Sequence, residues 1–438
     1  MKNANILAYV VLQTLLFITV SIFSSDMSML EFLSVIVPIT LLLINTKVSG
    51  QALSLYNIFI LVTCIFHFGE FWLNLFGVPV DTNNGHDIFQ IYDEEDVLAS
   101  LSFALSSLLI LNISATFVLK RIPQISLPSA TPKDLKVSKI IFVILLPFMV
   151  YNDWNRIIMT QLYSYSEAVY MTTFLSRFEI CFIVSGLFII TEKKKFSKFV
   201  FGYLLFRAVL LMTYTGSRIG MILELILLLY VNTINTKIST KKIFEFGLIA
   251  YIGLVIIGYV KLNRGTFDIS LHEFLSKGSI LSSQLSEFGS TMETLILAVK
   301  YDAVVGSLNG LTYLSAILTI LPMSTYFFPF ILKYRVAHDF LNPFAPSVGA
   351  LGGSFFAEQY LNFGESGMLL SILFGILFAK LQNSISAETN TFKSVLSISV
   401  FYGILIYSRA NMYDFIAAIC GIIYFIVMYW FIGKIIKG

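Results

Sequence analysis

The sequence predicts an all-α polytopic membrane protein with about twelve transmembrane helices. Of its 438 residues, 57% are hydrophobic, 15% are aromatic and only 13% are charged. A chain of this length cannot bury so much apolar surface inside one water-soluble core. The apolar residues also occur in long runs whose polar connectors alternate between lysine-rich and lysine-poor, which is typical of alternating cytoplasmic and external loops.

The apolar runs give the predicted spans in order along the chain. Several runs are shorter than the roughly 20 residues needed for a full crossing, so we expect their flanks to join the helices. The first run lacks a small-residue cleavage site before Ser24, which favours a retained helix over a signal peptide. The predicted spans are Asn5–Phe23, Leu30–Ile44, Leu53–Phe76, Val97–Leu119, Ile140–Tyr151, Phe174–Ile190, Phe199–Thr213, Ile219–Val231, Ile243–Val260, Met368–Phe378, Val395–Ser408 and Phe415–Ile432.

Lysines mark the connectors that we expect to be cytoplasmic, because the cytoplasmic loops of membrane proteins carry an excess of positive charge. Lys2 and Lys437 lie at the two ends of the chain, so both termini are expected on the cytoplasmic side. The other connectors hold most of the arginines. The lysine-rich connectors contain Lys47, Lys120, Lys133, Lys136, Lys139, Lys193, Lys194, Lys195, Lys198, Lys237, Lys241, Lys242, Lys380, Lys393 and Lys434.

One apolar run, Leu311–Leu332, is long enough to span but carries Pro322 and Pro329. Counting it as a crossing would place Lys380 and Lys393 outside, so we expect it to lie in the membrane interface. The predicted organisation is residues 1–261 for spans one to nine, residues 262–367 for an external, periplasmic loop domain with interfacial helices, and residues 368–438 for spans ten to twelve.

Composition also excludes several classes of partner and cofactor. A formal net charge of +3 is close to neutral and indicates no nucleic-acid partner. Cys64, Cys181 and Cys420 all lie in apolar stretches, which argues against disulfides and a metal cluster. The acidic loop Asp81–Asp96 lacks the ordered ligand spacing of a calcium site. We therefore expect neither a metal nor another cofactor.

Three segments carry residues suited to chemistry. The first is the turn Thr213–Gly220, which leads into the eighth span and contains Arg218. The second, Ala350–Gly367, reads ALGGSFFAEQYLNFGESG and closes the external domain, and the third, Tyr407–Asp414, lies between the last two spans. Arginines on the external side are disfavoured by translocation, and their planar fork suits a phosphate or another anion. The pattern therefore predicts an external anion site.

Together these segments resemble the Wzy-type O-antigen and oligosaccharide repeat-unit polymerases. In that family a glycine-rich turn with arginine precedes a mid-chain span, a long external loop follows, and a stretch like GGSFFAEQYLNFGESG leads into the closing helices. The external run from Leu162 to Arg177 also looks like that family. The resemblance implies a metal-independent glycosyltransferase of the GT-C-like membrane class, in the bacterial cytoplasmic (inner) membrane, with its active site on the periplasmic face.

The resemblance also implies the reaction and its partners. Such an enzyme takes a glycan from undecaprenyl diphosphate and transfers its reducing end to the non-reducing end of another lipid-linked repeat unit. Donor and acceptor would both be undecaprenyl-diphosphate-linked oligosaccharides in the lipid bilayer, and a chain-length regulator is a candidate partner. A departing diphosphate needs its growing charge neutralised, which arginines can do where no metal is held.

On this basis we expect Arg218, Arg264 and Arg409 to bind the donor diphosphate, with Arg177 in support. The same arginines could instead be interfacial anchors that grip lipid phosphates, and Arg177 could pair with Glu179.

Three residues are candidates for the base that removes a proton from the acceptor hydroxyl, namely Glu358, Glu287 and His338. Glu358 and Glu287 could only brace their loops, and a lone histidine is more often structural or solvated. Arg207 and Glu224 stand at similar distances from the turn near Thr215 on adjacent antiparallel helices, which favours a buried structural pair over a catalytic role.

Two other functions remain open from the sequence. An O-antigen ligase would use the same donor with a lipid A core acceptor, and the glycine-rich loop ending in LNFG favours polymerisation. A polysaccharide transporter or flippase is expected to show repeated halves and broken helices around a midplane site, whereas these arginines cluster at one face.

Overall fold

A computed structural model describes the chain at residues 2–80, 87–121, 127, 130–162, 178–192, 194–215, 218–234, 259, 280–321, 323–345, 351–385 and 390–436. Every regular element in these ranges is a helix, as the composition predicts. The chain divides into two compact units. Unit 1 comprises Met1–Gln124, Ser282–Asn383 and Ile404–Ile416, and unit 2 comprises Ile125–Leu281, Ser384–Gly403 and Ala417–Gly438.

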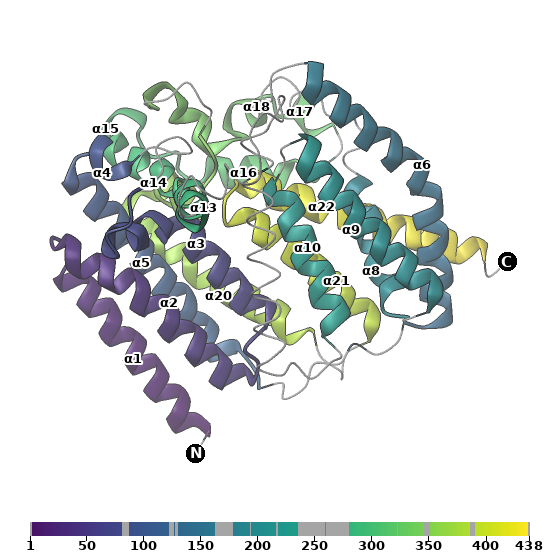
Figure 1. Cartoon of the computed structure of the whole chain (residues 1–438), viewed down its shortest axis with the longest axis horizontal. Coiled ribbons are helices and arrows are strands. Elements are labelled where there is room, and N and C mark those ends of the chain that lie inside the picture. Colours follow the sequence, from purple (N-terminus) through teal and green to yellow (C-terminus); the bar gives the residue numbers. More distant parts are fainter. Residues whose placement is uncertain are drawn as a thin grey trace. The chain divides into compact units, whose positions relative to one another are not determined.

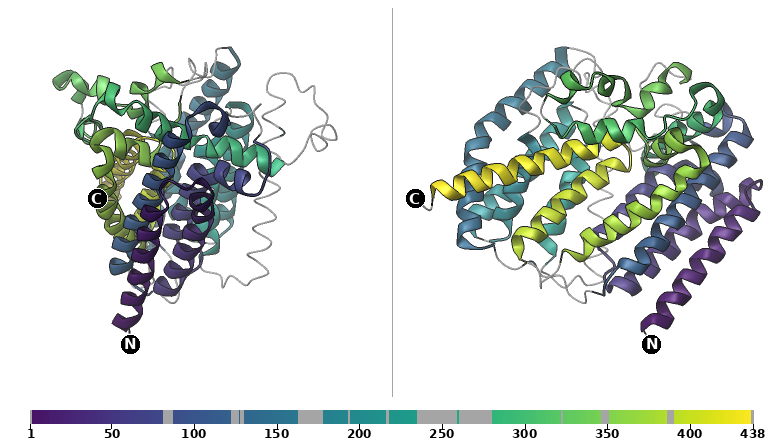
Figure 2. Two further views of the ribbon diagram at one scale, coloured as in Figure 1. Left: turned by 90° about the vertical axis from the view of Figure 1, so that its left-hand side faces the viewer. Right: turned by 180° about the vertical axis from the view of Figure 1, so that it is seen from behind.

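Unit 1 is built on a bundle of long apolar helices that lie side by side in Figures 1 and 2. Buried amides hold the bundle together, because Asn112 donates to Gln13 at 2.9 Å and accepts from Asn45 at 2.8 Å. Polar side chains of this kind fasten helices where no water competes. The helices of the bundle are α1 (Lys2–Ile22), α2 (Met27–Ser49), α3 (Leu55–Leu75), α5 (Glu94–Val118) and α20 (Leu370–Asn383).

Local signals set the ends of these helices. The side chain of Asp26 accepts a hydrogen bond from the amide of Met29 and caps α2, which ends at Gly50 in the left-handed conformation (φ 80°). Ser54 caps α3 in the same way. Three carboxylates open α5, where they complement the positive end of the helix dipole.

The lysine-rich ends of the bundle meet at the end where α1 begins (Figure 1). There the amide of Tyr56 donates to Gln382 at 3.2 Å, and the amide of Lys120 donates to Asn383 at 2.9 Å. The start of α3 and the ends of α5 and α20 are thus joined. Lys120 and Lys380 therefore lie at the same end of unit 1, as their assignment to one side of the membrane requires.

Short helices gather at the opposite end of the bundle (Figures 1 and 2). Lys300 reaches the start of α5 with an ion pair of 2.7 Å to Asp93, and Tyr92 donates to Glu293 at 2.8 Å. The short elements are α4 (Ile88–Ile91), α13 (Ile280–Gly289), α14 (Thr291–Lys300), α15 (Asp302–Val305), α16 (Leu311–Leu318), α17 (Ser324–Phe327), α18 (Phe330–Tyr334), η2 (Ala337–Phe340), η3 (Asn342–Phe344), α19 (Phe355–Phe363) and η4 (Gly364–Leu369).

Unit 2 packs α6 (Pro132–Leu162), α8 (Glu179–Ile190), α9 (Lys195–Thr215) and α10 (Arg218–Thr233) against one another. The rings of Phe142 and Phe182 stack with centroids 4.4 Å apart. Gly186 lets Leu204 approach α8, since a Cβ there would lie 2.6 Å from that side chain. The last two helices, α21 (Thr391–Tyr407) and α22 (Met412–Ile435), each contribute to both units.

Six helical stretches are long and apolar enough to cross a membrane, and three shorter apolar helices accompany them in the described ranges. Four of the six match the first four predicted spans within a few residues. About twelve spans and a GT-C-like fold stay predictions. The stretches are Asn5–Ile22, Met27–Ser49, Leu55–Leu75, Glu94–Val118, Phe355–Asn383 and Met412–Ile435, and the shorter helices are Glu179–Ile190, Ile222–Asn232 and Thr391–Tyr407.

Two elements differ from the sequence prediction in extent. The stretch that begins at Phe355 starts inside the expected external domain, because the motif after Ser354 folds as α19 with that serine as its N-cap. Helix α6 continues 11 residues beyond Tyr151, because its polar residues Asp153 and Arg156 find partners on neighbouring helices. The predicted span Ile243–Val260 lies outside the described residues, apart from position 259.

Candidate functional site

The turn from Tyr407 to Asp414, here called the closing turn, joins α21 to α22 in unit 1. Its fold follows from a capping box, in which the Asp414 side chain accepts from the backbone amide of Asn411 at 3.1 Å. This contact fixes the start of α22 at Met412 and leaves the side chain of Asn411 available for other elements. Arg409 stands within this turn.

Glu358 reaches the closing turn from α19 and is 1% exposed. Its Oε2 accepts from the amide of Met412 at 2.7 Å, and its Oε1 accepts from the hydroxyl of Thr312 on α16 at 2.8 Å. The hydroxyl of Tyr407 also interacts with this carboxyl group. A carboxylate at the first free amide of a helix is favoured by the helix dipole. Glu358 therefore ties α16 and α19 to the start of α22.

The segment Leu351–Ser354 passes directly against the closing turn, and glycine makes this possible. A Cβ on Gly353 would lie 2.5 Å from the carbonyl carbon of Ala410, which is a severe overlap. Two further hydrogen bonds hold the segment, one between Ser354 and His67 at 2.8 Å and one from Thr294 to the carbonyl of Gly352 at 2.8 Å. The position of Gly353 in the second sequence motif is thus explained by close packing.

Arg409 is half-buried beside this segment. Its guanidinium carbon lies 5.5 Å from the centre of the Phe66 ring on α3, within the range of a cation–π contact. A Cβ built on Gly352 would be 3.8 Å from its Nε. The planar charge is therefore held between an aromatic ring and the glycine segment.

His338 adjoins the closing turn through Asn411. The Asn411 amide nitrogen lies 3.3 Å from His338 Nδ1, and its side-chain oxygen accepts from the amide of Ala337 at 3.1 Å. Since the amide group can only donate through nitrogen, Nδ1 is the accepting nitrogen and the ring proton belongs on Nε2. Burial lowers the pKa of His338, so the neutral ring is favoured. Nearby, the guanidinium carbon of Arg335 lies 4.3 Å from the Tyr413 ring centre.

The structure therefore brings Arg409, Glu358 and His338 to one turn, as parts of one unit. Glu287 lies on α13, next to Phe288, whose ring packs edge-on against Phe66 with centroids 5.6 Å apart. The same Phe66 ring contacts Arg409, so α13 borders this site.

Three of the predicted arginines are not placed there. Arg177 and Arg264 lie outside the described residues, and Arg218 begins α10 in unit 2, where its backbone but not its side chain is described. Their role at a diphosphate stays a prediction.

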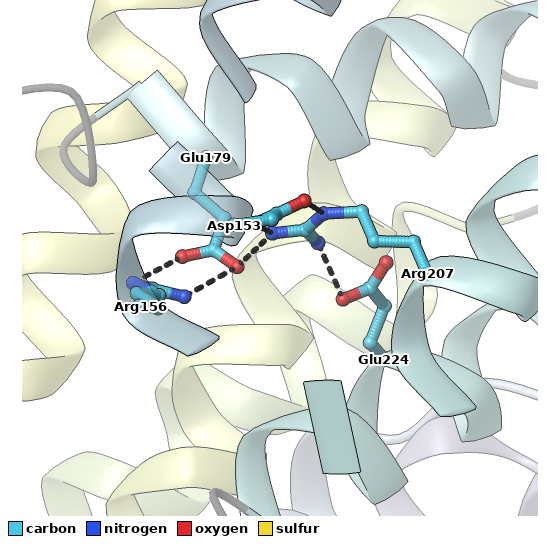
Figure 3. Close-up of polar contacts among 5 residues, drawn as sticks. All are labelled: Asp153, Arg156, Glu179, Arg207 and Glu224. Carbon is cyan, nitrogen blue, oxygen red and sulfur yellow. Dashed lines mark hydrogen bonds and ion pairs between the residues drawn. The ribbon is translucent and has the colours of Figure 1, made fainter. Parts of the chain in front are cut away.

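Unit 2 contains a second charged cluster, which we call the ion cluster: Asp153, Arg156, Glu179, Arg207 and Glu224 (Figure 3). Arg207 is 2% exposed and lies at its centre. Its guanidinium donates to Asp153 at 2.7 and 2.9 Å, to Glu179 at 2.5 Å and to Glu224 at 3.2 Å. Arg156 completes the cluster with a two-pronged contact to Glu179 at 2.9 and 3.3 Å. The predicted pairing of Arg207 with Glu224 is confirmed.

The ion cluster fastens four helices, since α6, α8, α9 and α10 each contribute at least one member. Arg207 is engaged with three carboxyl groups, which makes it unsuited to bind a substrate anion. Glu179 accepts hydrogen bonds from Arg156 and Arg207. The alternative pairing of Glu179 with Arg177 involves a residue outside the described ranges and stays a prediction. Among the residues that the structure describes, two guanidiniums face three carboxyl groups, and one oxygen of Glu224, Oε1, has no hydrogen-bond partner.

The sequence motifs included the closing turn but did not indicate that Asn411 and Asp414 fix its conformation. The Asn-x-x-Asp spacing of Asn411 and Asp414 is a recognisable helix-start signal and could have been used. Asp153 and Arg156 gave no comparable signal, because a polar group after an apolar run normally indicates the end of a span. Within the described ranges, no group of three or more His, Cys, Asp or Glu side chains is arranged to hold a metal ion.

Comparison with known proteins gives one result across nearly the whole chain. The family model described as O-antigen polysaccharide polymerase Wzy matches residues 5–438. No curated protein and no solved structure shows significant similarity to the chain.

Proposed function

The chain belongs to the O-antigen polysaccharide polymerase Wzy family, and we propose that the closing turn of unit 1 is part of its catalytic site. Membership makes the protein an integral membrane polymerase of the glycosyltransferase kind that acts on lipid-linked oligosaccharide repeat units. It also favours polymerisation over the ligase and transporter alternatives. The observation that carries the proposal is the convergence of Arg409, Glu358 and the glycine segment on one turn.

In the proposed reaction, a hydroxyl at the non-reducing end of the acceptor repeat unit attacks the anomeric carbon of the donor glycan. A new glycosidic C–O bond forms while the bond from the anomeric carbon to the diphosphate oxygen breaks. The undecaprenyl diphosphate leaves with that electron pair, and the hydroxyl proton passes to a protein base. The chain on the acceptor lipid is thereby extended.

Arg409 is the proposed contact to the departing diphosphate. A guanidinium stays charged at any physiological pH and offers a planar pair of donors that matches two phosphate oxygens. Its position between Phe66 and the glycine segment limits the freedom of the side chain, which reduces the reorganisation needed when charge develops. The sequence-based assignment of Arg177, Arg218 and Arg264 to the donor diphosphate remains a prediction of the same kind.

Glu358 is the base that we favour among the three candidates. Donors from α16 and α22 hold its two oxygens, so its position relative to Arg409 is fixed by the fold. His338 is a weaker candidate because its Nδ1 already accepts from Asn411, and the proton on Nε2 leaves no free acceptor. Glu287 borders the site through its neighbour Phe288 and stays a further candidate.

We also propose the wider setting that the sequence predicts. The protein would lie in the bacterial inner membrane with both termini in the cytoplasm, about twelve spans and a GT-C-like arrangement. The closing turn would then face the periplasm, where both lipid-linked substrates are displayed. The placement of the short helices of unit 1 at the end opposite Lys120 and Lys380 supports this orientation.

The test is polymerisation of purified undecaprenyl-diphosphate-linked repeats by the purified protein, with a strong chelator present. Arg409→Lys keeps the charge but loses the fork, so elongation should fall about tenfold or more, corresponding to about 1.4 kcal/mol or more. Glu358→Gln should still bind donor while failing to transfer, since a base acts mainly on the transition state.

The matched control is Arg121→Lys, an exposed arginine at the lysine-rich end of the same unit. Normal elongation by both Arg409→Lys and Glu358→Gln would exclude the closing turn from the catalytic site. Loss of wild-type activity on chelation would instead exclude the metal-independent mechanism.

A further inference from the structure

Helix α16 buries small and polar residues and exposes large apolar ones, which is the reverse of a helix in a water-soluble protein. Its buried face consists of Thr312, Ser315 and Ala316, which are at most 1% exposed. Its opposite face carries large apolar side chains, and Leu314 and Ile317 are 45% and 50% exposed. A helix that packs in water buries its large apolar residues and exposes the polar ones. Small residues toward the protein and large apolar ones outward are instead typical of a helix that faces lipid.

The next two helices continue the same surface. Met323, Tyr326 and Phe327, at the start of and within α17, are 70%, 76% and 65% exposed, and Leu332 on α18 is 63% exposed. Ile331 is fully buried and packs α18 inward. We call α16 to α18 the apolar hairpin. An exposed apolar surface of this extent on three consecutive helices requires an occupant.

The apolar hairpin adjoins a membrane-spanning stretch of the same unit. The ring of Tyr313 on α16 stacks near Phe363, with centroids 6.2 Å apart, and lies 6.4 Å from the ring of Phe374 on α20. Along that stretch, Leu369 and Leu373 are 58% and 64% exposed, as expected for side chains that contact lipid. The hairpin therefore adjoins a stretch that is long and apolar enough to cross a membrane.

We propose that the apolar hairpin is inserted into the bilayer and that lipid hydrocarbon chains cover its outer face. Its residues between Leu311 and Leu332 include no charged side chain, and Lys333 follows at its end. The Lys333 ammonium lies 5.2 Å from the Tyr334 ring centre. A lysine beside a tyrosine at the edge of an apolar surface is typical of the membrane–water boundary. Insertion from one side also agrees with the prolines in the run, which disfavour a straight crossing.

With the hairpin inserted in the bilayer, lipid would cover one face of α16 and protein would cover the other. Lipid holds the outer one, while Thr312 on the inner one donates to Glu358, and Asn362 donates to Thr312 at 2.7 Å. The bilayer would thus help to place the carboxyl group that we assign to the reaction. This consequence depends on the proposed function, whereas lipid contact itself does not.

The experiment measures the environment of single spin labels in the full chain, reconstituted in phospholipid bilayers. Cys64, Cys181 and Cys420 are first replaced by alanine. Labels are then attached at Leu314→Cys and Ile317→Cys, and collision with oxygen, which concentrates in lipid, is compared with collision with a water-soluble nickel chelate. Both labels should collide more with oxygen than with nickel.

Labels at Asp302→Cys and Asp339→Cys provide the matched controls, because these exposed residues belong to the same loop and should prefer nickel. Nickel preference at Leu314 and Ile317 would overturn the proposal by placing the hairpin in water. Low collision with both reagents would also overturn it, because protein would then cover the surface. The readout needs no polymerase activity, so it is independent of the proposed function.

A second measurement covers the possibility that labels disturb α16. Tyr326→Trp, in a chain whose three native tryptophans are changed to phenylalanine, should be quenched by phospholipids brominated on their acyl chains. Fluorescence unchanged by brominated lipid would contradict insertion.

Discussion

Replacing Arg207 by leucine should destabilise unit 2 more than removing Glu224, although the two residues pair. In the intact ion cluster, three carboxyl groups face two guanidiniums. Arg207→Leu leaves three carboxyl groups with Arg156 alone, which contacts only Glu179 among them. Glu224→Leu leaves two carboxyl groups matched by two guanidiniums.

The contacts give the size of each effect. Arg207 supplies three ion pairs from a site that is 2% exposed, and removing one side of a buried ion pair costs about 3–5 kcal/mol. Glu224 loses one contact of 3.2 Å, the longest that Arg207 makes in the cluster, which corresponds to about 1.5–3 kcal/mol at most. A domain is typically stable by about 5–15 kcal/mol, so the arginine variant should lose much of its folded population.

The assay is accumulation in membranes together with thermal unfolding of the purified protein in lipid nanodiscs. The informative rescue is the triple variant Asp153→Leu, Arg207→Leu, Glu224→Leu, which leaves only the two-pronged pair of Arg156 and Glu179. It should recover most of the loss, because Asp153 and Glu224, which pair with Arg207, are removed together with it. The double variant of Arg207 and Glu224 should recover less, since Asp153 loses its ion pair with Arg207 and stays buried.

Equal loss of stability in the two single variants would refute the reasoning from charge balance. A triple variant no more stable than Arg207→Leu would refute it as well.

Three further perturbations test other parts of the account. Gly353→Ala should lower thermal stability and polymerisation, because the added Cβ overlaps the closing turn. Gly202→Ala should be tolerated, because a Cβ there has open space around it. Equal stability and activity of the two variants would contradict the packing argument. In intact cells, an impermeant thiol reagent should label Asp302→Cys but not Ala52→Cys, and the reverse would invert the topology. Burial lowers the pKa of His338, so the stability that its neutral ring contributes is complete above about pH 6.5 and is lost as the pH falls. The variant His338→Gln should therefore show a smaller fall in Tm between about pH 7 and pH 5 than the wild type. A fall in Tm equal to that of the wild type would contradict this.

The long helices of unit 1 were predictable because each is a continuous apolar run, and lipid on the outside makes hydrophobicity alone a sufficient signal. The lysine-rich connectors that contain Lys47, Lys120 and Lys380 likewise predicted which helix ends lie at the same end of the bundle. The prediction was least complete where polar side chains are buried. Asp153 and Arg156 read as the end of a span, yet they continue α6 because Arg207 and Glu179 on other helices neutralise them.

The closing turn shows the same limit on a smaller scale. The sequence identified Arg409 and Glu358 as separate candidates in two motifs, and His338 as a lone histidine of the external domain. Their convergence depends on contacts between residues far apart in the chain, such as Glu358 with Met412 and His338 with Asn411. No periodicity within one segment encodes such contacts. The tight approach of Gly353 to Ala410 is another case, since a glycine pair in a sequence does not reveal what packs against it.

The lipopolysaccharide ladder of a deletion strain tests most directly whether this chain joins repeat units at a site containing Arg409. Deletion should leave a single repeat unit on the lipid A core, and the wild-type chain should restore the ladder. The Arg409→Lys variant should not restore it, although it accumulates normally. Loss of even the single repeat on deletion would contradict polymerase function and indicate ligation or transport. A full ladder with Arg409→Lys would contradict the proposed site.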